Sequence, residues 1–397
     1  MLSPESAGII RATLPVVGAS LDAITARFYD TMFAERPELL DGMFNRGNQA
    51  NGEQRRALAG AVAAFAAALV ERPGERPDRM LARIAHKHTA VGVTSEHYII
   101  VQKYLFGAIA DVLGEAVTPQ VAAAWDEVYW LMAGALIALE ASIYTEAGAR
   151  DGDTWRRWSV VERREETPDV ASFLLRPLGD DPVPPGRPGQ YVSVRLRMPD
   201  GVHQLRQYSL SGGNGDGTRR ITVKRVRGGD GPDGEVSTLL HATVAVGDEL
   251  TLSAPFGDVA LEDGDAPLVL ASAGIGCTPI AAMLEHLVAI GSTRRVLFLH
   301  ADRSPADHAL REDTERLIAA LPGAERILWY EEAPSDDAHT GQMDLTGVEI
   351  PEGAVAYMCG PLPFMRGVRA QLLRAGVAAR DIHYEVFGPD LWLGADA

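Results

Sequence analysis

The chain has 397 residues, which is enough for two or three domains that each bury a core of their own. Asp and Glu number 54 against 37 for Lys and Arg, and the formal charge of −17 disfavours nucleic acids and anionic membrane surfaces as partners. With two cysteines, Cys277 and Cys359, the sequence excludes a disulfide scaffold, a cysteine-rich zinc site and a four-thiolate iron–sulfur cluster.

The start of the chain does not read as a signal peptide, because no basic segment precedes an apolar one. The apolar run over 57–70 is too short to span a bilayer. We therefore expect a cytoplasmic protein without stable membrane insertion, and a monomer.

Residues 1–150 are predicted to be all-helical, because glycine and proline are sparse there and the apolar residues recur at helical spacing. The expected helices cover 3–18, 20–34, 52–71, 77–91, 95–114 and 118–148. The polar stretch 148–154 is expected to be a linker.

The remainder of the chain changes character twice. From Trp155 to about Glu262, short β-rich runs alternate with Gly, Pro and Asp clusters, which is typical of an antiparallel barrel or sandwich. From Ala266 onward, strands alternate with helices, as in a βαβ series with a parallel sheet. The predicted domains are 1–149, 153–263 and 264–397.

His88 lies on an apolar helix face with Leu81, Ile84 and Val91. A histidine on such a face is usually a core residue. His86 shares the other side with Arg79 and Arg83, and His97 in a first helical turn is expected to be solvated.

A haem-ligating histidine needs an acceptor for its second ring nitrogen. Tyr98 and Glu140 are candidates for that hydrogen-bonded chain with His88. A glutamate within an apolar run needs a partner if it is buried. Spacing alone leaves open whether Glu140 is buried or lies on the exposed side of its helix.

The stretch Arg206-Gln207-Tyr208-Ser209-Leu210 lies between two strand-like runs. An arginine, an aromatic ring and a hydroxyl at one strand end provide a phosphate fork, a stacking plane and a donor to a flavin nitrogen. This combination predicts a flavin site.

Two further motifs follow hydrophobic strands. In Gly274–Pro279 the two glycines let backbone approach a pyrophosphate, although the spacing differs from the usual dinucleotide fingerprint. Cys359-Gly360-Pro361 follows a strand end, at the sheet edge where ligands bind. For both cysteines, a buried and unreactive thiol is the simpler expectation.

Residues 1–147 resemble the globin domain of flavohaemoglobins. The matching segments are 26–30, 36–39, 44–45, 48–49, 51–55, 87–89 and 141–144. The resemblance implies that His88 is the axial iron ligand, supported by Tyr98 and Glu140, and that Lys87 tunes the electronics of the prosthetic groups. It also implies a distal side formed by Tyr29 and Gln54 facing O₂, Leu58 one turn after Gln54, and Phe44 packed on the porphyrin.

Residues 155–397 resemble ferredoxin–NADP⁺-reductase modules. For FAD, the resemblance implies that Arg206 pairs with the diphosphate, Tyr208 flanks the isoalloxazine and Ser209 bonds near the reactive nitrogen. Gln207 lies within this motif, Tyr191 belongs to a second matching motif, and a small helix opened by Gly234, Glu235, Val236 and Ser237 receives phosphate.

For NAD(P)H, the resemblance implies a site made of Gly274, Ile275, Gly276, Cys277, Thr278 and Pro279, with Cys359, Gly360 and Pro361 on the nicotinamide side. Family members often have Gln in place of Cys277. The final motif is Glu385, Val386, Phe387, Gly388 and Pro389, in which Phe387 would stack on the flavin and Val386 replaces a frequent Cys.

The resemblance implies a nitric oxide dioxygenase with haem b and FAD, in which electrons from NAD(P)H reach the haem and O₂ converts nitric oxide to nitrate. Two alternatives remain: a haem-based O₂ sensor or carrier kept ferrous by its own reductase, and a flavin reductase for a separate acceptor. The segment 300–304 holds both an acid and a base, so NADH is not distinguished from NADPH.

Overall fold

The computed structural model describes residues 2–44, 52–75, 77–150, 152–179, 183–213, 217–228, 233–332 and 337–388. These residues form two compact units. One comprises the described part of 1–155, together with 195–206 and Gly388, and the other comprises the described part of 156–194 and 207–387.

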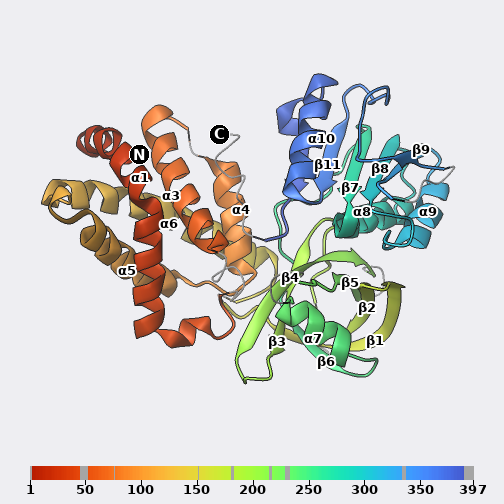
Figure 1. The fold of residues 1–397 in the computed structure, drawn as a ribbon, viewed down its shortest axis with the longest axis horizontal. Helices are drawn as coiled ribbons and strands as arrows, with labels where there is room; N and C mark the ends of the chain where they lie inside the picture. The colour runs from red at the N-terminus through yellow and green to blue at the C-terminus, as the bar shows by residue number, and fades with distance from the viewer. Residues whose placement is uncertain are drawn as a thin grey trace. The chain divides into compact units, whose positions relative to one another are not determined.

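The first unit is built on helices (Figure 1). Proline occupies the first turn of the first and last long helices, where its missing N–H costs nothing. Ser3 and Thr118 cap these same two helices through their side chains. The helices are α1 (Pro4–Glu35), η1 (Pro37–Leu40), α3 (Glu53–Glu71), α4 (Asp78–Thr89), α5 (Ser95–Leu113), η2 (Gly114–Ala116) and α6 (Pro119–Glu146).

The expected break between helices 3–18 and 20–34 is wrong, because α1 runs through both. Pro15 lies inside it and removes one helical hydrogen bond, at a cost of about 3 kcal/mol. Ile10, Val17 and Ile24 recur at seven-residue spacing and are all buried, so one apolar face continues across the proline. Each buried aliphatic side chain contributes about 1.5–3 kcal/mol, which together outweighs the proline.

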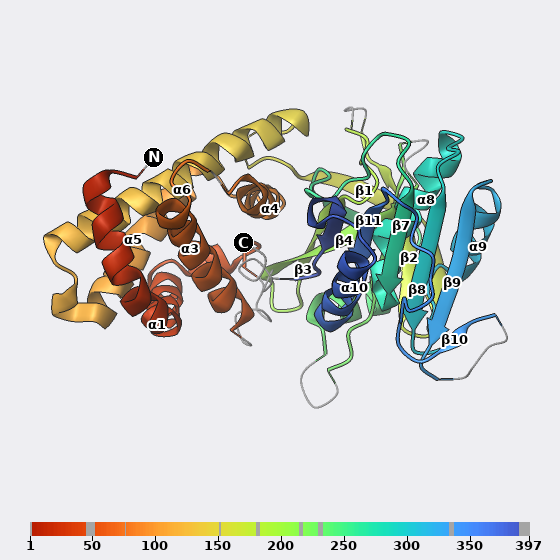
Figure 2. The same cartoon turned by 90° about the horizontal axis from the view of Figure 1, so that it is seen from above.

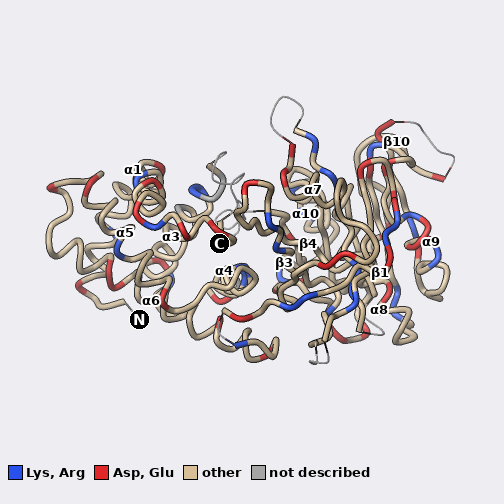
Figure 3. Tube along the Cα trace, turned by 90° about the horizontal axis from the view of Figure 1, so that it is seen from below, with Lys and Arg blue, Asp and Glu red and all other residues tan. Residues whose placement is uncertain are grey.

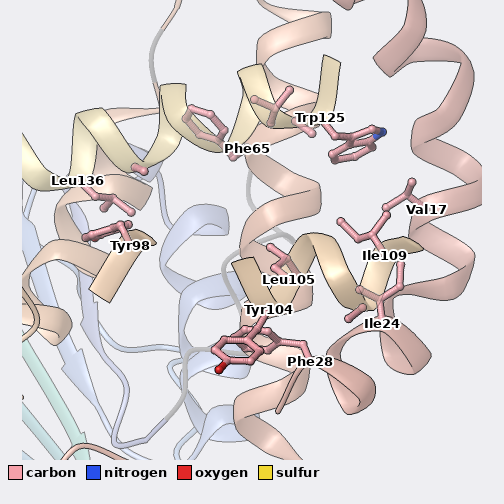
Figure 4. Close-up of a cluster of buried hydrophobic side chains, with 14 of the residues drawn as sticks. Val17, Ile24, Phe28, Phe65, Tyr98, Tyr104, Leu105, Ile109, Trp125 and Leu136 are labelled. Carbon is pink, nitrogen blue, oxygen red and sulfur yellow. The ribbon is translucent and has the colours of Figure 1, made fainter. Parts of the chain in front are cut away.

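The helical core gathers side chains from α1, α3, α5 and α6 (Figure 4). Phe28, Phe65, Leu105 and Trp125 are among its fully packed members. By length and composition alone, α1 and α6 are long and apolar enough to cross a membrane. Both nevertheless supply side chains to this core, which is where the unit buries its apolar surface.

Six antiparallel strands close a barrel in the order β1-β2-β5-β4-β3-β6, so the barrel alternative is correct and the sandwich is not. Val170 and Phe173 of β2 and Tyr191 and Val192 of β3 are buried, and side chains of this kind fill the interior of a small closed barrel. The elements are β1 (Arg156–Thr167), β2 (Val170–Pro177), β3 (Tyr191–Arg197), β4 (His203–Gly212), β5 (Arg219–Lys224), α7 (Glu235–Thr243) and β6 (Glu249–Leu252).

The last part of the chain is a parallel sheet in the order β10-β9-β8-β7-β11-β12. Strands β7, β8 and β9 lie side by side (Figure 2). β7 and β8 are nearly continuous apolar runs, as expected for a sheet covered on both faces. The elements are β7 (Leu268–Ala273), η3 (Gly274–Gly276), α8 (Cys277–Ala289), β8 (Val296–Asp302), α9 (Arg311–Ala319), β9 (Ala324–Tyr330), β10 (His339–Thr340), β11 (Val355–Cys359), α10 (Leu362–Arg374), η4 (Ala379–Asp381) and β12 (Ile382–Glu385).

The strand register determines which residues meet at the ligand-binding edge. Ser272 of β7 pairs with His300 of β8 and with Cys359 of β11, and Cys359 pairs with Glu385 of β12. Because all these pairings are parallel, the carboxyl ends of four strands share one edge. The predicted nucleotide motifs therefore converge there.

Candidate functional sites

The helical unit places His88 in the last turn of α4, against α5 and α6. Its Nδ1 lies 2.8 Å from Glu140 Oε1 and 3.0 Å from the Tyr98 hydroxyl. The Tyr98 hydroxyl in turn donates to Glu140 Oε1 at 2.5 Å. Glu140 is 3% exposed, so the interpretation that it lies on the solvent side of its helix is wrong.

This arrangement leaves one ring nitrogen of His88 for a ligand. When Nδ1–H donates to the Glu140 carboxylate, the Nε2 lone pair is left for a ligand. Burial and the charge of Glu140 raise the pKa of Tyr98, so its phenol remains a hydrogen-bond donor. These residues therefore fit a haem iron, with a basic imidazole held in one orientation.

A second layer of tyrosines fixes the helices that carry this chain. Tyr129 donates to the carbonyl of Tyr98 at 2.6 Å, and Tyr144 donates to the carbonyl of Val93 at 2.7 Å. His97 is a capping residue, since its Nδ1 accepts the backbone N–H of Thr94 at 3.0 Å. The expectation of a merely solvated His97 is wrong.

The predicted distal residues come from α1, the segment after it and α3. Tyr29 is buried, with its ring 5.5 Å from that of Phe33 and 6.1 Å from that of Phe44. Leu58 of α3 helps line an apolar cavity. Gln54 belongs to α3, but its side chain lies outside the described residues, so its predicted role stays a prediction.

Lys87 precedes His88 on α4. Its Nζ donates to the carbonyl oxygen of Gly388 at 2.7 Å, within the same compact unit. Its predicted effect on the prosthetic groups stays a prediction, and Pro389 lies outside the described residues.

The flavin motif lies along β4. Ser209 is 4% exposed, and its Oγ has no hydrogen-bond partner among the described residues. An unpaired buried hydroxyl costs about 1–3 kcal/mol, which a flavin acceptor atom would relieve. Arg206 and Tyr208 are half-buried, while Gln207 is exposed and Tyr191 of β3 is buried. The residues present therefore fit FAD.

The N-terminus of helix α7 has the features of a phosphate-binding turn. Gly234 caps it without a side chain, so no side chain occupies the first backbone N–H groups. A Cβ on Gly234 would lie 2.8 Å from both the Ser237 hydroxyl and Val226. Val236 is buried and anchors the turn, whereas Glu235 is exposed.

The turn after β7 is shaped by close backbone approach. A Cβ on Gly276 would lie 2.2 Å from the carbonyl oxygen of Cys359, so only glycine fits against the β11 loop. Gly274 has a φ of +52°, and Thr278 donates to the carbonyl of Ile275 at 3.0 Å. The residues present form a cradle for a diphosphate.

Pro279 is the third residue of α8, because the helix begins at Cys277 after a 3₁₀ turn. It still lies in the turn whose N–H groups have no helical partner. Burial raises the pKa of the Cys277 and Cys359 thiols, as expected for unreactive cysteines. Gly360 follows β11, and Pro361 caps α10.

The final motif closes the sheet edge. Glu385 ends β12 and is buried, and Val386 follows it. Phe387 is 47% exposed, which is unusual for so large an apolar ring and leaves it available to cover a flavin.

One charged cluster of the reductase part was not predicted from the sequence. Asp313 accepts from Arg164 at 2.6 Å and from Arg220 at 2.7 Å, which joins α9 to the barrel. Helix α9 carries both acidic and basic side chains (Figure 3), so its sequence does not single out Asp313. The bonds to Arg164 of β1 and Arg220 of β5 show that Asp313 joins the helix to the barrel. Asp302 and Arg303, the acid and base noted in the segment 300–304, lie at the end of β8, where Asp302 Oδ1 accepts the backbone N–H of Arg303 at 2.8 Å.

Three family models match the chain. A globin model matches residues 26–136, an oxidoreductase FAD-binding domain matches 157–261, and an oxidoreductase NAD-binding domain matches 270–370. These matches, with the geometry above, define the class: an oxidoreductase that joins a haem-binding globin to an FAD- and NAD-binding reductase.

The relatives define the family within that class. A flavohemoprotein of Bordetella parapertussis is 42% identical over 98% of this chain and 99% of its own, and one of Bacillus subtilis is 37% identical over 99% of both. The crystal structure of a Malassezia yamatoensis flavohemoglobin with bound FAD and heme has a TM-score of 0.91 and 39% identity, covering 98% of this chain and all of that one. The chain belongs to the flavohaemoprotein family.

One solved structure covers only the reductase part. It is described as the flavohem-like FAD/NAD binding domain of nitric oxide dioxygenase from Vibrio cholerae O1 biovar El Tor. It is 38% identical, with a TM-score of 0.56, and spans 59% of this chain and all of that one.

Proposed function

We propose that this protein is an NAD(P)H-dependent nitric oxide dioxygenase, which combines nitric oxide with O₂ to form nitrate. The observation that carries the proposal is the buried Glu140, bonded to both His88 and Tyr98. An imidazole made electron-rich in this way favours O₂ activation over simple storage. The Vibrio cholerae relative named above supports the choice of nitric oxide.

The bound groups would supply the redox chemistry, with FAD dividing a hydride into single electrons and haem activating O₂. The protein's own part is to bind and orient. His88 would hold the iron, while Tyr29 would donate its hydroxyl to bound O₂. Ser209 would donate to the flavin, and the Gly274–Gly276 turn would bind the diphosphate of NAD(P)H.

The same residues weigh against the alternatives. A flavin reductase for a separate acceptor has no use for a buried glutamate–tyrosine–histidine chain beside an apolar helical core. An O₂ sensor or carrier has no need for an electron-rich imidazole. The globin match implies O₂ binding in every case, so the distinction rests on turnover with nitric oxide.

The test is an absorbance spectrum of the purified protein followed by NADH-dependent NO consumption in air. We expect a Soret band and rapid consumption in the wild type. Tyr29→Phe should slow consumption and keep the Soret band, whereas His88→Ala should lose both. Undiminished NO consumption in both variants would contradict the mechanism, and a normal oxy spectrum with slow turnover would favour the carrier.

We further propose that the protein works as a cytoplasmic monomer that is not inserted in a membrane. NAD(P)H is an intracellular reductant, and the net charge of −17 disfavours anionic lipid surfaces. Fractionation of cells and the mass of the purified holoprotein in solution test these expectations.

A further inference from the structure

Helix α8 begins at the nucleotide turn and contacts the barrel further along its length. The turn Gly274–Gly276 leads directly into α8, so the position of this helix determines where a bound diphosphate lies. The described parts of β7, α8 and the strands β4 and β5 from Gln207 onward belong to one compact unit. The contacts between α8 and the barrel are therefore a structural link between the nucleotide site and the flavin site.

Glu285 of α8 makes the first of these contacts. Its Oε1 accepts the backbone N–H of Gly213 at 2.8 Å, and its Oε2 lies 3.9 Å from Nη2 of Arg220. Gly212 is the last residue of β4, and Gly213 follows it. The carboxylate thus binds the end of the strand on which the flavin motif lies.

The fit between Glu285 and the end of β4 is close. A Cβ on Gly212 would lie 2.2 Å from Oε2 of Glu285, and Gly212 has a φ of +142°, which L side chains rarely adopt. Arg220 is fixed by other partners, since its Nη1 donates to Asp313 at 2.7 Å and its Nη2 donates to the carbonyl of Ser211 at 2.6 Å. A side chain at Gly212 would therefore displace the carboxylate.

Met283 of α8 makes the second contact, with the segment that leads into β3. A Cβ on Gly189 would lie 2.8 Å from Cε of Met283, so the methionine packs directly on this glycine. Gly189 precedes Gln190 and Tyr191, and the carbonyl of Gln190 accepts the backbone N–H of Leu210 in β4 at 2.9 Å. Helix α8 therefore contacts both segments in which the flavin-binding residues are predicted.

Hydride transfer depends strongly on the distance between the two reacting groups. The reacting atoms must approach to about 3–3.5 Å, and a misplacement of about 1 Å can lower the rate by about 100-fold. The predicted flavin residue Ser209 lies on β4, and the predicted diphosphate turn opens α8. A shift of α8 against the end of β4 would therefore move the nicotinamide relative to the flavin.

We propose that Glu285 is a positioning residue for hydride transfer, which fixes α8 on the end of β4 and thereby sets the approach of the nicotinamide to the flavin. In that step the hydride passes with its electron pair from C4 of the nicotinamide to N5 of the flavin. The nicotinamide is oxidised, the flavin is reduced, and Glu285 exchanges no proton. The inference goes beyond the proposed function and rests on the FAD- and NAD-binding reductase alone.

Anaerobic stopped-flow mixing of the holoprotein with NADH separates the limiting rate of flavin reduction from the dissociation constant of NADH. Glu285→Ala should lower the limiting rate roughly tenfold, because the bond to Gly213 is lost. The dissociation constant should change by less than about twofold, because the diphosphate turn is intact. An unchanged limiting rate, or a loss confined to NADH affinity, would overturn the proposal.

Glu285→Gln tests whether the bond to Gly213 is the cause. The glutamine keeps a side-chain oxygen that can accept this N–H, so most of the limiting rate should return. Glu349→Ala is the matched control, since it removes a carboxylate that pairs with Arg295 at 3.2 Å, just before β8, and should leave the rate unchanged. A loss of the same size in the control variant would contradict a specific role for Glu285.

A spectroscopic measurement separates positioning from stability. NAD⁺ added to the reduced protein should give a long-wavelength charge-transfer absorbance, which requires overlap of the nicotinamide and flavin rings. This absorbance should weaken in Glu285→Ala and return in Glu285→Gln. Full absorbance in Glu285→Ala, with only a lower unfolding temperature, would show a merely structural role and overturn the proposal.

Flavin reduction requires neither O₂ nor nitric oxide, so the failure of this proposal would leave the proposed function untouched. Conversely, the predicted flavin kinetics in a protein that consumes no nitric oxide would refute the proposed function alone. The two failures are therefore distinguishable.

Discussion

The haem-side site and the nucleotide edge are built on opposite principles. Around His88, side chains provide the chemistry: a carboxylate, a phenol and an imidazole lie within 3.0 Å of one another, and the carboxylate and the phenol are buried. Around Gly276, the site depends on the absence of a side chain, because the backbone of Cys359 fills the space where a Cβ would lie.

The difference indicates what each site tolerates. A buried charge is stable only while every partner remains, so the haem side should respond sharply to changes that keep shape but remove charge. The nucleotide edge should instead respond to changes of volume.

Replacing the ligand should have the largest effect. We expect His88→Ala to lose the Soret band and to reduce NO consumption to background. The reason is that His88 is the histidine of α4 whose Nδ1 is bonded to Glu140, which leaves Nε2 for the iron. His86→Ala, two residues earlier, is the matched control and should retain both. A full Soret band in His88→Ala would show that the ligand has been misassigned.

A substitution that removes the charge of Glu140 and keeps the size of its side chain should have the second-largest effect. Glu140→Gln should lower NADH-dependent NO turnover by about 10–100-fold and raise the reduction potential of the haem, because the imidazole loses its anionic partner. Tyr98→Phe keeps the charge and should have a smaller effect on the potential. If the two variants shift the potential equally, the charge of Glu140 is not the cause.

Adding volume tests the nucleotide edge. Gly276→Ala should destabilise the reductase part by about 1–3 kcal/mol and weaken NADH binding, because its Cβ would meet the carbonyl of Cys359. Gly367→Ala in α10 has open space around it and should stabilise by up to about 1 kcal/mol. Thermal unfolding followed by flavin fluorescence compares the two, and similar behaviour would contradict the close approach.

The Asp313 cluster predicts a pH dependence. Burial raises the pKa of Asp313, but the bond from Arg164 and the charges of Arg220 and Arg164 outweigh it and lower the pKa to about 2. A carboxyl whose pKa is lowered on folding stabilises the fold above its usual pKa, and the benefit is lost as pH falls toward 2.

Asp313→Asn should therefore cost about 2 kcal/mol at pH 7, and the difference from wild type should shrink between about pH 4 and pH 2. Urea unfolding of both proteins at several pH values measures it. A difference that stays constant with pH would rule out the ion-paired carboxylate.

The smallest effect concerns the thiols. Cys277 and Cys359 are buried and their pKa values are raised, so neither should react with an alkylating reagent in the native holoprotein at pH 8. Both should react in denaturant, as counted by mass spectrometry. Rapid native labelling of either thiol would mean that the edge opens in solution.

Much of the architecture follows from local pattern. Apolar spacing predicted α5 and α6, and the glycine turn after β7 predicted the nucleotide edge. What could not be predicted depends on partners distant in the chain. The burial of Glu140 is decided by the packing of α4 against α6. The continuity of α1 is decided by the core into which its apolar face packs, and the spacing of residues around Pro15 does not show that core.

The same limit applies to the end of β8. Asp302 and Arg303 are adjacent in the sequence, and each suits a different nucleotide. Only the fold shows that Arg303 is bonded to Asp307 and that the Asp302 carboxylate lies 3.4 Å from His300 Nε2.

The most direct test of the central claim is the product of NO consumption. Purified protein with NADH in air should convert each NO consumed to nitrate, and omission of NADH should stop the reaction after the reduced protein is exhausted. Nitrite or nitrous oxide as the main product, or nitrate formation that continues without NADH, would contradict the account.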